Sequence, residues 1–139
     1  MPRLSHAAAA RALAGVDPAL DALLALAGPV RMRPRDPDGH FGALVHAIVF
    51  QQLAGAAARA IHGRVRALVD GPLTAPALIA ISDEALRGAG LSAAKLASIR
   101  DLSAKVADGT LPIARLPRLP DDAVVALLSQ VRGIGRWTA

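Results

Sequence analysis

The residues best suited to chemistry lie at the end of the chain, in residues 131–138 with the sequence VRGIGRWT. Glycine adopts positive φ easily, so Gly133 and Gly135 predict a tight reversal with positive φ at both positions, and a second helix beginning near Arg136. Amides at the start of a helix have no acceptor within it and can bind an anion. The neighbouring Arg132 and Arg136 favour a polymer phosphate. An ordinary glycine-capped helix end is the plainer alternative.

The charge of the chain favours a polyanionic partner. The sequence contains 16 Lys and Arg against 11 Asp and Glu, a formal net charge of +5. Lys95 and Lys105 are the two lysines, so the other cations are arginines, which suit bidentate contacts to phosphate. Genomic base composition is an alternative explanation for the preference for Arg over Lys, but it does not explain why the net charge is positive. A nucleic acid is the partner that this charge predicts.

Length and composition indicate one modest helical core. The chain has 139 residues, of which 53% are hydrophobic and 2% aromatic, so Leu, Val, Ile and Ala must build the core. No apolar run approaches the roughly 20 residues of a membrane span, and no export pattern follows the N-terminus. With no Cys in the sequence, we expect a cytoplasmic protein that makes no membrane contact.

Apolar spacing predicts a series of helices and no strand of convincing length. The longest predicted helices are residues 40–51, 56–69 and 92–107, and a further helix precedes the glycines at residues 121–130. In the second of these, the predicted inner face carries Ala57, Ala60, Ile61, Val65 and Leu68. Residues 6–14 and 19–27 form two N-terminal helices, and a Pro- and Arg-rich connection, residues 31–39, separates them from the rest.

Several motifs along the chain carry a resemblance to a known family. The hairpin V-x-G-I-G-x-W-T-A, the segment F-x-x-L-V-x-x-I-V-x-Q-Q-L from Phe41, the helix start G-L-S-x-x-K from Gly90 and the run D-G-T-L-P from Asp108 occur in this order. Together they resemble the helix-hairpin-helix DNA glycosylase superfamily, in particular its DNA-3-methyladenine glycosylase II branch. The resemblance covers residues 41–139. It implies an all-α helix-hairpin-helix bundle over residues 37–139.

The resemblance also implies how the chain would bind damaged double-stranded DNA. The tip between two helices would enter the minor groove and fill the gap left by a rotated nucleotide, a role that falls on Gln52 with Gln51 and Leu53 beside it. A solvated helix end is the alternative. The Ser that the family has after Leu53 is Ala54 here, so the next helix loses a capping hydroxyl.

At the hairpin, the resemblance implies a phosphate site and a cation site. The phosphate site comprises Arg132, Gly133, Ile134, Gly135, Arg136 and Thr138. The carbonyl oxygens of Ser129, Val131 and Ile134 would coordinate a monovalent cation, Na or K, when DNA is bound. No cofactor is required.

The single tryptophan distinguishes two kinds of glycosylase. The resemblance places Trp137 in the base pocket, where its ring can stack on a cationic alkylated purine. Endonuclease III-like relatives have a strand-cleaving Lys at that position, so the expected activity is that of a monofunctional DNA-3-methyladenine glycosylase in base-excision repair. A lone aromatic residue is otherwise usually part of a core.

No catalytic residue can be assigned within the sequence. The family's catalytic Asp follows the second hairpin helix, which places it beyond Ala139. We therefore expect residues 1–36 to pack with a C-terminal subdomain outside this sequence, and the 139-residue chain to be inactive by itself and monomeric. The four histidines lack the spacing of a metal site. A non-catalytic helix-hairpin-helix DNA-binding module is the alternative function.

Overall fold

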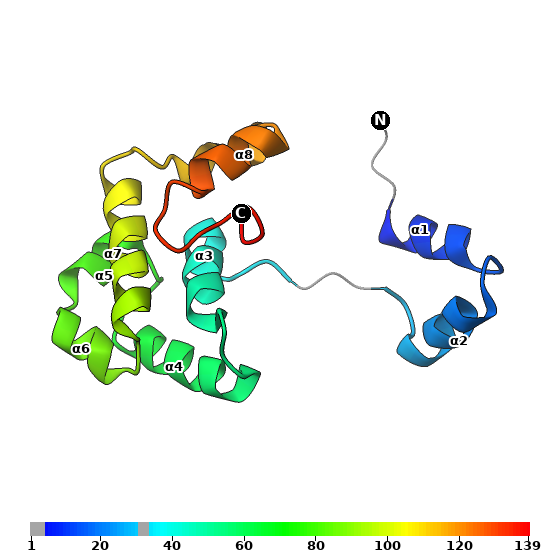
Figure 1. Ribbon diagram of the computed structural model, residues 1–139, viewed down its shortest axis with the longest axis horizontal. Coiled ribbons are helices and arrows are strands. Elements are labelled where there is room, and N and C mark those ends of the chain that lie inside the picture. Colours follow the sequence, from blue (N-terminus) through cyan, green and yellow to red (C-terminus); the bar gives the residue numbers. More distant parts are fainter. Residues whose placement is uncertain (1–4, 31–33) are drawn as a thin grey trace. The chain divides into compact units, whose positions relative to one another are not determined.

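The computed structural model describes residues 5–30 and 34–139, and this part of the chain is helical without a strand. Figure 1 shows the helices in chain order. This confirms the predicted all-α class. None of the described helices has the length and hydropathy needed to span a membrane. The elements are α1 (His6–Leu13), α2 (Pro18–Ala27), α3 (Gly39–Phe50), α4 (Gly55–Ala67), α5 (Ala75–Ala80), α6 (Asp83–Gly88), α7 (Ala93–Ala107), the 3-10 helix η1 (Ile113–Arg118) and α8 (Asp121–Leu128).

The first unit of the chain, Met1–Pro34, contains α1 and α2. Ser5 caps α1 and Asp17 caps α2, each through a side-chain oxygen that accepts an amide hydrogen bond, and Pro18 occupies the first helical position. Neither helix buries a residue, and Leu23 and Leu26 are 58% and 87% exposed. The apolar residues of α2 therefore find no core within their own unit.

The second unit, Arg35–Ala139, holds one hydrophobic core around α3. Val45, Ile48 and Val49 of this helix are fully buried, and α3 contacts α4, α7 and η1. Burying apolar side chains is the main favourable contribution to folding. As the composition predicted, aliphatic residues fill most of this core, which also includes Val65, Leu73, Leu78, Leu86, Leu91, Ile99, Leu102, Leu111, Leu128, Val131 and Ile134.

Side-chain caps determine where several helices of the second unit begin. Thr74, Ser82 and Ser92 each accept a hydrogen bond from an amide in the first turn of α5, α6 and α7. Helix α4 begins differently, because Ala54 at its N-cap makes no side-chain bond. The hydroxyl missing from this sequence thus leaves the start of α4 without the cap that its three neighbours have.

The buried face of α4 differs from the predicted one. The buried or half-buried residues are Ala58, Ile61, His62, Val65, Arg66 and, after the helix, Val69. Ala57, Ala60 and Leu68 are exposed instead, so these three predictions were wrong. Alanines occur on every side of this helix, so their spacing does not determine which face turns inward. The larger Val65 and Val69 decide it by packing into the core.

Candidate nucleic-acid interface

The hairpin, residues 131–136, follows α8 as a series of turns anchored by two buried residues. Val131 and Ile134 are almost completely buried, and the Ile134 amide donates to the Val131 carbonyl at 3.0 Å. Gly133 lies between them with φ +79°. A Cβ on Gly133 would lie 2.6 Å from Oγ of Ser98, so both conformation and space require glycine here. The hairpin is thereby held against α7.

Two predictions about the hairpin are corrected by the structure. Gly135 does not have positive φ, so one glycine makes the reversal. No second helix begins near Arg136 within the described residues. The chain forms a single turn there, in which the amides of Thr138 and Ala139 both donate to the Gly135 carbonyl at 3.0 Å. One turn secures few of the hydrogen bonds that make a helix stable, since nucleation is its costly step.

The backbone of the hairpin nevertheless offers donors for an anion. Among the described residues, no acceptor is paired with the amides of Gly133, Gly135, Arg136 and Trp137. All four of these residues are exposed, so a ligand can reach this part of the backbone. Those of Gly135, Arg136 and Trp137 are consecutive, and free backbone amides in a turn can bind phosphate oxygens. The amide of Arg132 is not part of this set, because it donates to Oδ2 of Asp101 at 2.8 Å.

The carbonyl oxygens predicted to hold a cation are not equivalent. The Val131 carbonyl accepts the hydrogen bond from the Ile134 amide. Within the described residues, the carbonyls of Ser129 and Ile134 accept none. A carbonyl oxygen has two lone pairs, so the bond to Val131 leaves one for an ion. Oxygen donors of this type suit a hard monovalent cation.

The tip, residues 51–53, joins α3 to α4. Nζ of Lys95 in α7 donates to the carbonyls of Val49 and Gln51 at 2.6 and 2.9 Å, which satisfies orphan acceptors at the end of α3. Burial lowers the pKa of Lys95. Gln52 then adopts φ +52°, a left-handed conformation that a residue with a Cβ occupies at a cost. Gln52 and Leu53 are exposed, as a residue that enters a duplex must be.

The structure brings the tip and the hairpin together. Nε2 of Gln51 donates a hydrogen bond to the Gly133 carbonyl at 2.8 Å, across 82 positions of sequence. Both segments line one open groove of about 390 Å³. Residues in the N-terminal turns of α7 also line it. The lining residues are Gln51, Gln52, Leu53, Ile61, Gly90, Ser92, Ala94, Lys95, Ser98 and Gly133.

Residues of α7 that the motifs did not single out support this arrangement. Asp101 receives the Arg132 amide and forms an ion pair with Lys105. Burial acts to raise the pKa of Asp101, but the hydrogen bonds from Lys105 and the Arg132 amide, with the charge of Lys105, hold that pKa below its usual value. The carboxylate therefore stays ionised and keeps accepting the hairpin amide. The i, i+3 spacing of Lys95, Ser98 and Asp101 is the sequence signal for their shared face.

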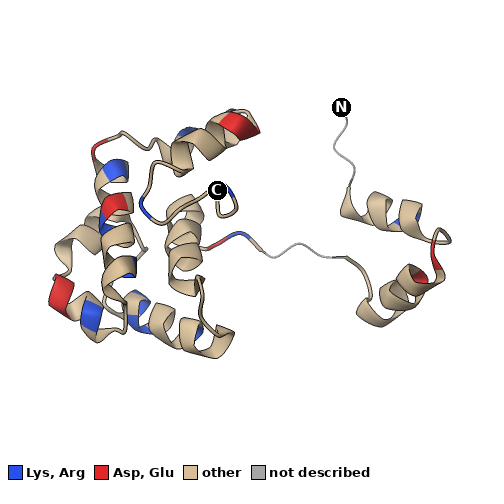
Figure 2. Cartoon of the chain, viewed as in Figure 1, with Lys and Arg blue, Asp and Glu red and all other residues tan. Residues whose placement is uncertain are grey.

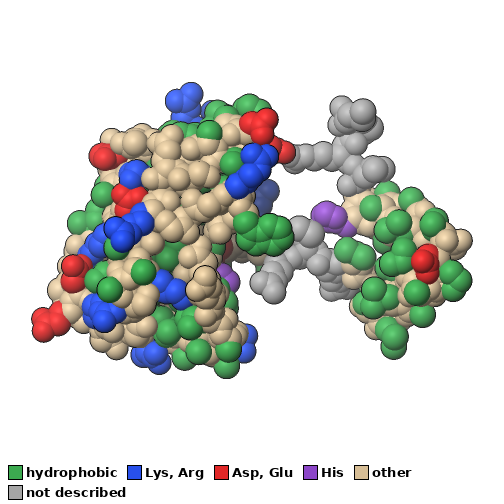
Figure 3. Space-filling model, viewed as in Figure 1, with side chains coloured by type: hydrophobic (Ala, Val, Ile, Leu, Met, Phe, Trp, Pro, Cys, Tyr) green, Lys and Arg blue, Asp and Glu red, His purple; other side chains and the backbone are tan. Residues whose placement is uncertain are grey.

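Four arginines of the second unit form hydrogen bonds or ion pairs with other groups of the protein. Arg64 donates to the Ala89 carbonyl and Arg87 to the Leu91 carbonyl. Arg66 pairs with Asp38 at 3.1 Å, and Arg100 binds Asp83 and the end of α5. Basic residues lie on several helices of the second unit (Figure 2). On the face in Figure 3 they alternate with acidic and hydrophobic side chains, so the net charge does not form one continuous basic patch there.

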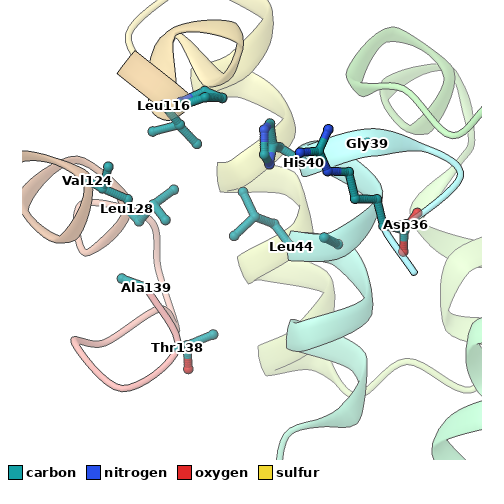
Figure 4. A pocket seen from close by; sticks show the side chains of 12 residues that line it. Asp36, Gly39, His40, Leu44, Leu116, Val124, Leu128, Thr138 and Ala139 are labelled. Carbon is teal, nitrogen blue, oxygen red and sulfur yellow. The ribbon is translucent and has the colours of Figure 1, made fainter. Parts of the chain in front are cut away.

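Trp137 is 100% exposed and does not line the groove between the tip and the hairpin. Next to it in sequence, Thr138 and Ala139 border a cavity of about 670 Å³ between α3, η1 and α8. In Figure 4, Leu44 extends from α3 into this space, opposite Val124 and Leu128 of α8. Thr138, predicted to belong to the phosphate site, thus lies at a mainly apolar cavity.

Two of the four histidines pack together between α3 and α4. His46 stacks on Phe50 with ring centroids 3.8 Å apart, and His62 meets His46 edge-on at 5.2 Å. Burial and the neighbouring His46 lower the pKa of His62, whose Nε2 is buried without a partner in the described part of the chain. No group of three potential metal ligands occurs among the described residues. The rings of His46 and His62 thus help to pack α3 against α4.

The chain is similar to a protein of Schizosaccharomyces pombe and to two solved structures. DNA-3-methyladenine glycosylase 1 of S. pombe is 32% identical over 133 residues, which are 91% of this chain and 57% of that protein. The S. pombe 3-methyladenine DNA glycosylase in complex with abasic DNA has a TM-score of 0.85 at 28% identity, covering 94% of this chain and 65% of that one. DNA-3-methyladenine glycosidase from Bacillus halodurans has a TM-score of 0.73 at 38% identity, covering 91% and 58%. No protein-family model matches the chain.

The helical bundle with its glycine hairpin after α8 has the fold of these DNA glycosylase structures. By sequence and by fold, this chain is homologous to the DNA-3-methyladenine glycosylases, which are helix-hairpin-helix glycosylases. The resemblance read from its motifs is therefore confirmed. The chain spans 57% to 65% of the lengths of these relatives.

Proposed function

We propose that this chain serves base-excision repair as part of a monofunctional DNA glycosylase that removes alkylated purines from double-stranded DNA. The observation that carries the proposal is the hydrogen bond between Gln51 and Gly133, which places the tip beside the free amides of the hairpin. A phosphate at the hairpin would then lie at a fixed distance from Gln52. The names of the relatives, and the abasic DNA in one of their structures, support the same activity.

In this proposal the hairpin and the tip contact different parts of the DNA. The amides of Gly133, Gly135 and Arg136 hold a phosphate, while the exposed Gln52 enters the minor groove and occupies the space of a rotated nucleotide. Rotation costs a few kcal/mol of stacking, and damaged bases cost less to rotate than normal ones. The exposed ring of Trp137 would stack on the cationic purine.

The carbonyls of Ser129, Val131 and Ile134 would hold a monovalent cation when DNA is bound. The observation that fits such an ion is that the carbonyls of Ser129 and Ile134 accept no hydrogen bond within the described residues. Its positive charge would add to the attraction between the hairpin and the phosphate backbone.

Replacing Gln52 by Ala tests the proposal directly. An exposed side chain contributes little to folding, so the free energy of unfolding should change by no more than about 0.5 kcal/mol. The preference for a duplex with an abasic analogue over an intact duplex should fall about tenfold, as expected when a central contact residue is truncated. Fluorescence anisotropy with both duplexes measures this ratio. Gln130→Ala is the matched control, and equal affinity of the unmodified chain for the two duplexes would contradict the proposal.

The state of the two lysines predicts that the chain does not cut the DNA strand. A strand-cleaving glycosylase attacks the sugar with an amine, but Lys95 is held by two carbonyls and Lys105 by Asp101. Borohydride should therefore trap no covalent adduct between the chain and abasic DNA, detected as a shifted band on a denaturing gel. An adduct that disappears in Lys95→Met would overturn the monofunctional assignment.

A further inference from the structure

Gln51 differs from the rest of the tip in where its side chain binds. Its amide nitrogen is bonded to the hairpin at Gly133, whereas the side chains of Gln52 and Leu53 are exposed and make no hydrogen bond among the described residues. The tip thus contains one side chain that holds the protein together and two that a ligand can reach.

The backbone from which Gln51 reaches is itself fixed by α7. The amide of Gln51 donates to the Ile48 carbonyl at 3.4 Å, a long bond that holds the end of α3 weakly. The two bonds from Lys95 to the carbonyls of Val49 and Gln51 are shorter and charge-assisted, so they determine where α3 ends. The next residue, Gln52, has the strained φ of +52°. Such strain persists only where the surroundings enforce it.

The hairpin end of the same bond is fixed by the same helix. Ser98 lies directly under Gly133, and Asp101 holds the amide of Arg132 at 2.8 Å. Lys95, Ser98 and Asp101 are spaced three residues apart, so they share one face of α7. A single rigid helix therefore supports both partners of the bond between Gln51 and Gly133.

We propose that Gln51 is a positioning residue that ties the tip to the hairpin, with Lys95 holding the backbone of the tip. A phosphate bound at the hairpin then aligns Gln52 with the minor groove before any nucleotide is rotated, because the spacing exists in the free protein. Preorganisation of this kind strengthens binding by reducing the ordering that binding must impose. The alignment of Gln52 on DNA rests on the proposed function. The tie, which is the hydrogen bond from Gln51 to the Gly133 carbonyl, is present in the free chain.

The first measurement tests the tie without DNA. Gln51→Met keeps the length of the side chain but removes its donor, and Gln130→Met makes the same change at an exposed glutamine outside the tip and the hairpin. Backbone 15N relaxation should show lower order parameters at Gln52 and Gly133 in Gln51→Met and unchanged ones in the control. Unchanged order parameters at both positions in Gln51→Met would overturn the proposal.

The second measurement tests what the tie does on DNA. In Gln51→Met, the preference for the abasic-analogue duplex over the intact duplex should fall about fivefold, the change that corresponds to about 1 kcal/mol for one hydrogen bond, at an unchanged melting temperature. Lys95→Met should lower the same ratio. A merely structural role would lower the melting temperature and leave the ratio intact, and that result would overturn the proposal. If the unmodified chain binds neither duplex, the proposed function fails and the order parameters alone decide the tie.

Discussion

Gly133→Ala should destabilise the protein and abolish most of its affinity for DNA. Two separate costs add up at this position. An alanine with φ +79° costs about 1–2 kcal/mol, and its Cβ would lie 2.6 Å from Oγ of Ser98, an overlap that costs about 1–3 kcal/mol to relieve. Because Ser98 is buried and bonded to the Ala94 carbonyl, the hairpin must move instead. Denaturant unfolding should show a loss of at least about 2 kcal/mol, and anisotropy a loss of tenfold or more in affinity.

Two control variants separate the cost of positive φ from the cost of the overlap with Ser98. Gly135 has ordinary φ and no atom within 4 Å of an added Cβ, so Gly135→Ala should leave stability nearly unchanged. Ser98→Ala removes the overlapping oxygen, after which the nearest side-chain atom to the new Cβ would be Cβ of residue 98 at 3.4 Å. The double variant Ser98→Ala with Gly133→Ala should therefore recover the steric part and keep only the cost of positive φ. Equal destabilisation by Gly133→Ala and Gly135→Ala would show that the hairpin is arranged differently.

The contrast between these glycines shows what a motif can predict. The spacing G-x-G indicated a reversal after an apolar helix, and a reversal is present. The sequence could not tell which glycine makes it, since glycine tolerates either sign of φ. Position 133 requires glycine because Ser98, 35 positions earlier in the sequence, leaves no room for a Cβ there. The predicted second helix is not present because residues 136–139, the last of this sequence, supply a single turn, in which the Ala139 amide donates to the Gly135 carbonyl.

The tip was found from the sequence, but the direction of its side chains was not. Two adjacent glutamines have the same chemistry, and nothing local distinguishes the one that binds Gly133 from the one left exposed. The distinction depends on the backbone, which Lys95 holds from another helix. By contrast, the buried face of α3 was predictable because large apolar residues recur at helical spacing, and Phe41, Leu44, Val45, Ile48 and Val49 are all buried.

Arg100→Met should lower the free energy of unfolding of the protein without changing its affinity for DNA. Arg100 donates to Oδ1 of Asp83 at 2.7 Å, to the Leu78 carbonyl at 2.6 Å and to the Ile81 carbonyl. Its removal leaves the Ile81 carbonyl without a partner among the described residues and the Leu78 carbonyl with the Ile81 amide alone, and an unsatisfied buried group costs about 1–3 kcal/mol. Because the side chain is 26% exposed, water can replace part of what is lost. We expect a loss of about 2–3 kcal/mol by denaturant unfolding.

Arg132→Met and Arg136→Met should weaken DNA binding and leave the stability of the protein nearly unchanged. The Arg136 side chain is 82% exposed and lies 4.0 Å from an exposed Asp122, a pair that contributes little to stability. Arg132 is also exposed, and its backbone bond to Asp101 survives the substitution. Stability should change by no more than about 0.5 kcal/mol. The slope of log affinity against log salt concentration should fall by about 0.9 for each phosphate contact removed.

The charge excess of the sequence is thus expected to serve two separate purposes. Arg100 satisfies carbonyls inside the bundle, whereas the exposed Arg132 and Arg136 of the hairpin would contact DNA phosphates under the proposed function. Salt titrations of all three variants distinguish these roles. An unchanged salt slope in both hairpin variants, or a reduced slope in Arg100→Met, would show that the phosphates bind elsewhere on the molecule. In that case the free amides of the hairpin would have to bind without help from their neighbouring arginines, and Gly133→Ala alone would report their contribution.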